Sequence, residues 1–240
     1  MFESKYSDIL TVILVVVIIA IVGLLGFWAY DVYSRNSIDK EAMNAINELE
    51  NQINNNQNNV KNEVTNNVTN NVVNQVEKPV ENILKPDVGG IIGSDTSNVT
   101  TPNGGSAQTY KGFVMVGYIE IPKTGIKYPV LEEVTKKSIE TSVAILYGPG
   151  LNKVGNTVIV GHNYRNGLFF SNNKKIAVGD KIYITDLSGN KVTYIVYNTY
   201  ETTPEDSDYM TRDTNGAMEI SLSTCTDDSS GRIITWARAE

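Results

Sequence analysis

Cysteine and histidine are the scarcest reactive residues of this 240-residue chain, since each of them occurs only once. A single cysteine excludes an internal disulfide, and it excludes the zinc sites that need several cysteines. Positive charge is also in short supply, because 20 basic residues stand against 27 acidic ones, for a formal net charge of −7. The chain lacks the basic field that attracts nucleic acid, so we expect no nucleic-acid partner.

Charge is missing altogether from residues 9–28, a run of 20 mostly apolar residues. A helix of that length spans about 30 Å, the thickness of a bilayer core. Trp28 and Tyr30 stand at its end, where aromatic side chains favour the membrane interface. The run is longer than the apolar region of a typical signal peptide. We therefore predict an uncleaved transmembrane anchor over residues 9–30.

Residues 31–110 are predicted to form an asparagine-rich stalk and linker. Twelve of the 25 residues from 51 to 75 are asparagine, and a segment this polar buries too little apolar surface to offset its ordering entropy. Valine recurs at every fourth position from Val60 to Val80, which places a narrow apolar stripe on one helical face. A flexible tether is the default expectation and a self-associating helical stalk is the alternative. Residues 86–106 have the Gly, Ser, Thr and Asn content of a linker.

Beyond residue 110 the pattern changes to short β-type runs separated by turn residues, with a short helix expected over residues 138–146. The expected strands are residues 116–121, 127–131, 156–160, 181–185, 191–197, 219–224 and 232–237. The sequence Ser-Gly-Asn at 188–190 favours a hairpin between two of them. Seven or eight strands in about 130 residues predict a closed barrel or a sandwich. We expect residues 111–240 to form a self-contained domain.

The only thiol and the only imidazole both stand where an apolar run meets a polar loop. Cys225 follows the run 219–224 and precedes the polar residues 226–231, and His162 follows the run 156–160. Taken singly, an inert buried cysteine and an ordinary hydrogen-bonded histidine are the common interpretations. Placed together at two strand ends, they favour nucleophilic thiol chemistry, because a neighbouring imidazolium favours the thiolate form of a cysteine.

Arg232 follows Cys225 by seven residues, across the polar loop. If the strands on either side of this loop pair antiparallel, the guanidinium lies beside the thiol. A guanidinium stays charged at any relevant pH and would hold a substrate carbonyl and the oxyanion formed on attack. Thr224 and Asn163 are the chain neighbours of Cys225 and His162, and we expect them to support the site.

Three motifs in this order resemble the signature of the sortase family: Gly-His-Asn at 161–163, Leu-Ser-Thr-Cys-Thr at 222–226, and Arg232. Residues 117–122 and 128–130 resemble the opening strands of that family. The likeness covers about residues 111–240, and an N-terminal anchor followed by a linker is also typical of sortases.

The resemblance implies a mostly β fold, an eight-stranded sortase-type barrel with short helices, preceded by the transmembrane helix and the stalk. It implies a cysteine transpeptidase that cleaves a Leu-Pro-x-Thr-Gly-like sorting motif of secreted proteins through a thioacyl intermediate on Cys225. Arg232 would then steady the tetrahedral intermediate, and His162 would exchange protons with the departing and incoming amines. The acceptor would be an amine of lipid II, of a peptidoglycan stem or of a pilin lysine.

The resemblance also implies a single-pass protein of the cell membrane of a Gram-positive bacterium, with residues 1–8 in the cytoplasm and residues 111–240 outside the cell. Features of class B and class D sortases are both present, so the subclass stays open. Some sortases bind calcium, but a solvated loop is favoured for the acidic residues between Glu201 and Asp208. We expect no metal and no other cofactor.

Two other functions compete with the transpeptidase. A cell-wall thiol peptidase of the papain-like kind usually has its cysteine before its histidine, whereas His162 precedes Cys225 by 63 residues. A stalked surface-binding module with an inert barrel would have no need for the intact set of Cys225, His162 and Arg232.

Overall fold

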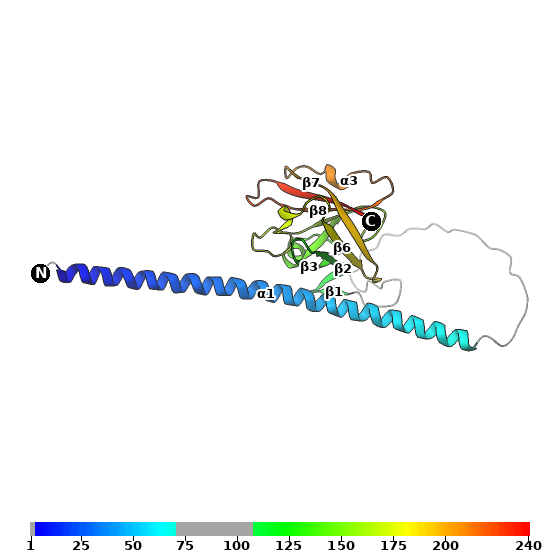
Figure 1. Cartoon of the computed structure of the whole chain (residues 1–240), viewed down its shortest axis with the longest axis horizontal. Helices are drawn as coiled ribbons and strands as arrows, with labels where there is room; N and C mark the ends of the chain where they lie inside the picture. The colour runs from blue at the N-terminus through cyan, green and yellow to red at the C-terminus, as the bar shows by residue number, and fades with distance from the viewer. Residues whose placement is uncertain (1–2, 71–107) are drawn as a thin grey trace, which may run out of the picture.

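The computed structural model of the chain describes residues 3–70 and 108–240, and the side chains of residues 9–58 and 108–240. A long helix, α1 (Glu3–Asn70), lies along a small β-barrel (Figure 1). The strands are β1 (Thr109–Tyr110), β2 (Phe113–Ile121), β3 (Ile126–Leu131), β4 (Val143–Tyr147), β5 (Gly155–Val160), β6 (Lys181–Asp186), β7 (Lys191–Thr202), β8 (Met218–Cys225) and β9 (Arg232–Ala239). The short helices are α2 (Lys136–Thr141), α3 (Asp208–Thr211) and the 3-10 turn η1 (Asn173–Lys175).

Within the described residues, eight strands close the barrel in the order β2-β3-β4-β5-β8-β9-β7-β6, and β6 pairs back onto β2. The pairs β3–β4 and β5–β8 are parallel, and the other pairs in the ring are antiparallel. Closure pairs both edges of the sheet, which protects backbone groups that an open edge would expose. The predicted eight-stranded barrel is confirmed, and all seven predicted strands lie inside observed ones.

Apolar side chains that alternate along the strands fill the barrel. Residues with no exposed area include Ile119, Ile159, Ile184, Leu222 and Ala237. The opposite face of β5 and β9 is covered by the segment that contains α3, where Tyr209 packs against Val158 and Ile234. The residues of β5 and β8 are therefore buried on both faces, and these strands are rigid supports for whatever follows them.

The helix expected over residues 138–146 is wrong beyond Thr141. A capping box starts α2, since the Ser138 backbone N–H donates to Thr135 Oγ1 (3.0 Å) and the Thr135 N–H donates to Ser138 Oγ (2.7 Å). Ser142 ends the helix in an extended conformation, and its hydroxyl donates to Pro129 O (2.6 Å). The following residues pair with β3 as strand β4, because that pairing is needed to close the barrel.

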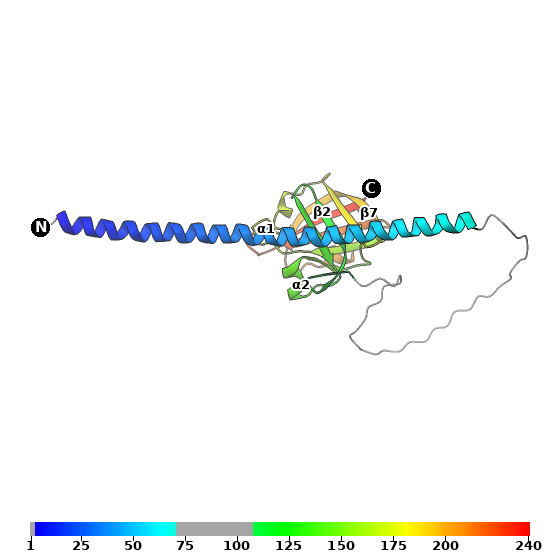
Figure 2. The same ribbon diagram turned by 90° about the horizontal axis from the view of Figure 1, so that it is seen from below.

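Residues 31–70 continue α1 as helix, so the flexible tether expected for this part of the stalk is wrong. Ala42, Ile46 and Leu49 lie on one face of α1, are almost completely buried, and belong to the main core cluster of the barrel. Figure 2 shows α1 crossing the barrel from one side to the other, with its N-terminal half extending beyond it. The helix is thus packed as a part of the folded domain.

The valine stripe after Val60 and the linker over residues 86–106 lie outside the residues whose side chains the structure describes. The division into residues 1–8, 9–30, 31–110 and 111–240 stays a prediction.

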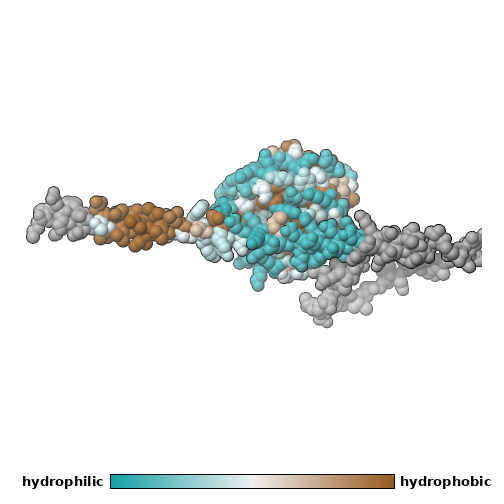
Figure 3. Space-filling view, turned by 60° about the horizontal axis from the view of Figure 1, so that its bottom comes forward, coloured by the Kyte–Doolittle hydropathy of each residue, from teal (hydrophilic) through white to brown (hydrophobic). Residues whose placement is uncertain are grey.

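The N-terminal part of α1 is apolar on all sides, and none of its side chains from Ile9 to Trp28 is buried. By length and composition this segment can cross a membrane. Figure 3 shows it as a continuous hydrophobic band, separated from the barrel by a short polar stretch. This helix fits the expected membrane anchor.

A chain that begins at Asp31 should be more stable than one that begins at Gln108, because the shorter chain lacks the helix that covers the barrel wall. Burial of one large aliphatic side chain contributes about 1.5–3 kcal/mol. Loss of Ile46 and Leu49 should therefore lower the free energy of unfolding by roughly 3–6 kcal/mol. Urea unfolding of the two purified chains measures the difference. Equal free energies of unfolding for the two chains would show that α1 does not stabilise the barrel.

Candidate active site

Cys225 and Arg232 face each other at the last pair of the β8–β9 ladder. Residues directly opposite in an antiparallel pair have Cβ atoms about 4.5–5.5 Å apart, so the register alone brings the two side chains together. Arg232 Nη1 lies 3.4 Å from Cys225 Sγ and also donates to Gly231 O (3.2 Å). Cys225 is a free, partly exposed thiol. The guanidinium of Arg232 therefore lies beside the thiol of Cys225, as predicted.

The loop that joins β8 to β9 is ordered by its own polar groups. The Thr226 N–H donates to Gly231 O (3.1 Å), and the Gly231 N–H donates to Thr226 Oγ1 (2.9 Å). Asp228 accepts from the hydroxyls of Thr226 (2.6 Å) and Ser230 (2.8 Å), which lowers the pKa of its carboxyl to about 2. The loop therefore holds the end of the ladder in register, so that Arg232 stays opposite Cys225.

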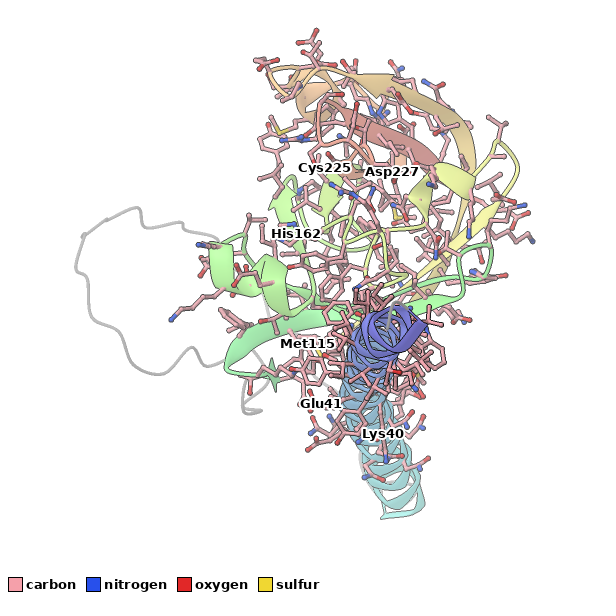
Figure 4. The ribbon with its side chains drawn as sticks, turned by 90° about the vertical axis from the view of Figure 1, so that its left-hand side faces the viewer. Lys40, Glu41, Met115, His162, Cys225 and Asp227 are labelled. Carbon is pink, nitrogen blue, oxygen red and sulfur yellow. The ribbon has the colours of Figure 1, made fainter. Side chains whose placement is uncertain are left out.

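His162 reaches the same end of the barrel because β5 runs parallel to β8. Their last paired residues are Val160 and Ser223, so His162 and Cys225 each follow two positions later. The buried Thr224 hydroxyl donates to Gly161 O (2.8 Å). This bond joins the ends of β8 and β5 one residue before Cys225 and His162. Figure 4 shows His162 and Cys225 at the same end of the barrel.

Gly161 precedes His162 at a point with no room for a side chain. A Cβ atom at this position would lie 2.8 Å from Val143 Cγ1 and 2.9 Å from Phe170 Cδ2. Phe170 is fully buried, as is the neighbouring Phe169. Its backbone N–H donates to His162 O (3.1 Å). The backbone of the histidine is therefore pressed against the core while its side chain stays near the surface.

The imidazole of His162 is oriented by an aromatic neighbour. Its ring lies 4.9 Å from the ring of Tyr164, with the two planes 31° apart, and Tyr164 in turn contacts Phe169 (5.8 Å). Partial burial lowers the pKa of His162 below its ordinary value of about 6.5, opposed by the negative charge of Glu140. At neutral pH the ring is therefore mainly uncharged and able to accept a proton.

Asn163 links the loop of the histidine to the loop of the cysteine. Its Nδ2 donates to Cys225 O (3.0 Å) and to Asp227 Oδ1 (3.0 Å). Asp227 also forms an ion pair with Lys174 of η1. These contacts to Lys174 and Asn163 lower the pKa of the Asp227 carboxyl.

All five residues singled out in the sequence thus meet at one end of the barrel. Asp227 and Lys174 were missed, and only the position of Asp227 in the polar loop after Cys225 hinted at a contact.

Two other polar features are a pocket at the opposite end of the barrel and the acidic stretch next to Thr202, which pairs with Arg232. A pocket of about 440 Å³, which includes Gly155, Asn156 and Arg212, lies at the opposite end of β5. Arg212 is paired there with the buried carboxylate of Glu219. In the acidic stretch, Asp206 accepts from the Thr202 hydroxyl (2.6 Å). Among the residues that the structure describes, no three His, Cys, Asp or Glu side chains gather in a way that could hold a metal.

Comparisons with known proteins agree with the resemblance seen in the sequence. The family model described as the sortase domain matches residues 119–240. Sortase A of Bacillus anthracis is 32% identical over 112 residues, which cover 46% of this chain and 52% of that protein. The chain thus spans about half the length of the curated relative that it matches.

Solved structures with a similar barrel come from several sortase classes. A sortase D5 transpeptidase of Clostridium perfringens is 27% identical, with a TM-score of 0.49 over 53% of this chain and 79% of that one. Sortase A of Corynebacterium diphtheriae is also 27% identical, with a TM-score of 0.49 over 53% and 61%. Sortase C1 of Streptococcus agalactiae is 23% identical, with a TM-score of 0.48 over 52% and 69%. The subclass of this chain stays open.

The titration of His162 should show the effect of its burial. Because the chain has one histidine, a single pair of imidazole proton signals reports on it in NMR spectra. We expect a midpoint below 6.5 in the native chain and a higher midpoint in Tyr164→Ala, since loss of the stacked ring admits water to the imidazole. Tyr183→Ala, on the opposite wall of the barrel, is the control. An unchanged midpoint in Tyr164→Ala would contradict this origin of the shift.

Proposed function

Because residues 119–240 match the sortase domain, this chain belongs to the sortase family, and we propose that it is a membrane-anchored cysteine transpeptidase. One observation carries the proposal: Arg232 Nη1 lies 3.4 Å from the only thiol, at the barrel end to which β5 brings the only histidine. A thiol, a proton carrier and a fixed positive charge are the groups that acyl transfer from an amide to sulfur requires.

The proposed substrate is a secreted protein with a Leu-Pro-x-Thr-Gly-like motif. The Cys225 thiol gives its proton to neutral His162, and the sulfur attacks the carbonyl carbon of the motif's threonine. Arg232 donates hydrogen bonds to the carbonyl oxygen as it becomes an oxyanion. His162 then passes the proton to the departing nitrogen, and the bond between threonine and glycine breaks. A thioacyl bond to Cys225 remains.

The second half-reaction consumes this intermediate. An amine of lipid II, of a peptidoglycan stem or of a pilin lysine attacks the thioacyl carbon, and His162 accepts the proton that the amine loses. Sulfur leaves, Cys225 regains its proton from His162, and a new amide bond has formed. The low pKa of His162 supports this assignment, because an uncharged imidazole is the form that accepts a proton. Every step uses side chains alone, so no cofactor belongs to the proposed reaction.

Asn163 and Thr224 are proposed as positioning residues. Each spans the gap between the chain segment of His162 and that of Cys225, through hydrogen bonds of 3.0 Å and 2.8 Å. Residues 9–30 are proposed to cross the membrane once, with residues 1–8 inside and the barrel outside the cell. The length and apolar character of the N-terminal part of α1 support a single crossing, and the proposed orientation follows from the family resemblance.

The thioacyl intermediate gives the direct test. Incubation of the chain with a sorting-motif peptide should yield an adduct heavier by one acyl fragment in intact-mass spectra. Cys225→Ala should yield none, because it has no nucleophile. Addition of an amine should convert the adduct to an amide product. A thiol peptidase would instead release acid at a rate that is independent of the amine. If the wild type forms no adduct with any of several motif variants, the inert binding module is favoured.

Arg232 variants test the electrostatic role. Arg232→Ala should lower kcat/KM by about 100- to 1,000-fold, the usual effect of removing one oxyanion donor. Arg232→Lys should retain part of the activity, because it keeps the charge but loses the planar set of donors. Arg165→Ala is the matched control, since it removes a nearby arginine that binds Ser229 Oγ (3.1 Å). Equal losses in Arg165→Ala and Arg232→Ala would refute a specific role for Arg232.

A further inference from the structure

Helix α1 runs without interruption from the apolar segment to the barrel wall. Gly26 is the last glycine before the docked stretch, and residues 27–58 contain neither glycine nor proline. Sharp kinks in helices arise mainly at these residues. Asp31 and Arg35 form an i,i+4 ion pair (3.1 Å) in the short stretch between the apolar segment and the barrel. The connection between membrane segment and barrel is therefore a stiff rod.

The barrel is fixed on this rod by apolar and polar contacts together. Ala42, Ile46 and Leu49 enter the core cluster. The Tyr128 hydroxyl donates to Asp39 Oδ1 (2.5 Å), and Lys127 pairs with Glu50 (3.0 Å). These polar contacts span eleven residues of α1, or about 16 Å. Contacts spread over such a length prevent the barrel from sliding or swinging on the helix.

The contacts at the two ends of the docked stretch give the barrel a direction. Arg35 Nη1 donates to Asn166 O (2.8 Å), and Asn166 lies four residues after His162 in the same loop. Farther along α1, Ile53 lies against Gly189 in the turn between β6 and β7. This turn is at the far end of the barrel, because β7 begins there and ends at Thr202, opposite Arg232. The catalytic end therefore faces the apolar segment.

The distance from the membrane to the catalytic end follows from helix geometry. Arg35 comes five residues after Tyr30, the end of the proposed anchor, which corresponds to about 8 Å along the helix. Figure 3 shows how short the polar stretch between the hydrophobic band and the barrel is. Figure 4 looks along α1 from its N-terminal side and shows His162 and Cys225 above the helix. The barrel end that carries Cys225 is thus the end nearest to the apolar segment.

We propose that α1 acts as a fixed-length strut by which the enzyme selects substrates according to the chain length between their membrane anchor and the scissile bond. This inference rests on the proposed transpeptidase function. A peptide whose scissile bond lies at the height of the thiol reaches it without strain. A scissile bond that is held closer to the membrane cannot reach the thiol. A scissile bond on a much longer tether reaches it, but at a lower effective concentration.

The test uses the full chain in liposomes with peptides that carry the sorting motif, a proline spacer of variable length and a lipid anchor. Proline spacers are semi-rigid and extend about 3.1 Å per residue. Seven helix-forming residues inserted between Tyr30 and Asp31 lift the barrel by about 10 Å and leave its contacts with α1 in place. The spacer length that gives the fastest thioacyl formation should then increase by about three to four residues.

The matched control carries the same seven residues after Asn58, beyond the contacts of Ile53 and Gln57 with the turn at Gly189, and should keep the original optimum. A water-soluble peptide without an anchor should react equally fast with all three chains. If the chain with the insertion between Tyr30 and Asp31 keeps the original spacer optimum and turns over the soluble peptide normally, the proposed strut is refuted. Absence of reaction with the soluble peptide in the wild type would instead refute the transpeptidase itself, so the two failures are distinguishable.

Discussion

The parallel pairing of β5 with β8 is the constraint on which the candidate site depends. Parallel strands end at the same edge of a sheet, and the pairing of Val160 with Ser223 makes His162 and Cys225 emerge level with each other. The antiparallel return of β9 then adds Arg232 opposite the thiol. A slip of one residue in either ladder would turn a reactive side chain to the other face. The geometry of the three groups is thus set by strand register, inside a closed barrel that resists such a slip.

Polar ties between the loops preserve this geometry beyond the ends of the strands. The buried bond from Thr224 to Gly161 is the costliest to lose, because its removal would leave a desolvated carbonyl without a partner. The contacts of Asn163 and Asp227 lie nearer the solvent and contribute less each, but they join both loops to η1. His162 is held by stacking on Tyr164, which leaves its ring free to take up and release a proton.

Helix α1 connects the apolar segment to this rigid frame. Its docked stretch is rich in polar residues, yet Ile46 and Leu49 are as deeply buried as the barrel's own core. The apolar segment, the barrel and the loops of the candidate site therefore form one mechanical unit, since Arg35 contacts the loop that follows His162. In such a unit the fold fixes the position of Cys225 relative to the apolar segment, as it fixes the distance between Cys225 and Arg232.

Local pattern was sufficient to predict seven of the strands and the apolar segment, and to single out three residues that the fold brings to one end of the barrel, because periodicity, length and scarcity can be read from neighbouring positions. It did not reveal that Asp227 meets Lys174, 53 positions away, nor that residues 143–147 form a strand instead of extending a helix. It also gave no sign of the surface that buries Ile46, since that surface is built around residues 126–131, far along the chain. Those features depend on which distant segments pack together. Only the closed barrel brings these segments into contact, so neighbouring positions in the sequence carry no sign of them.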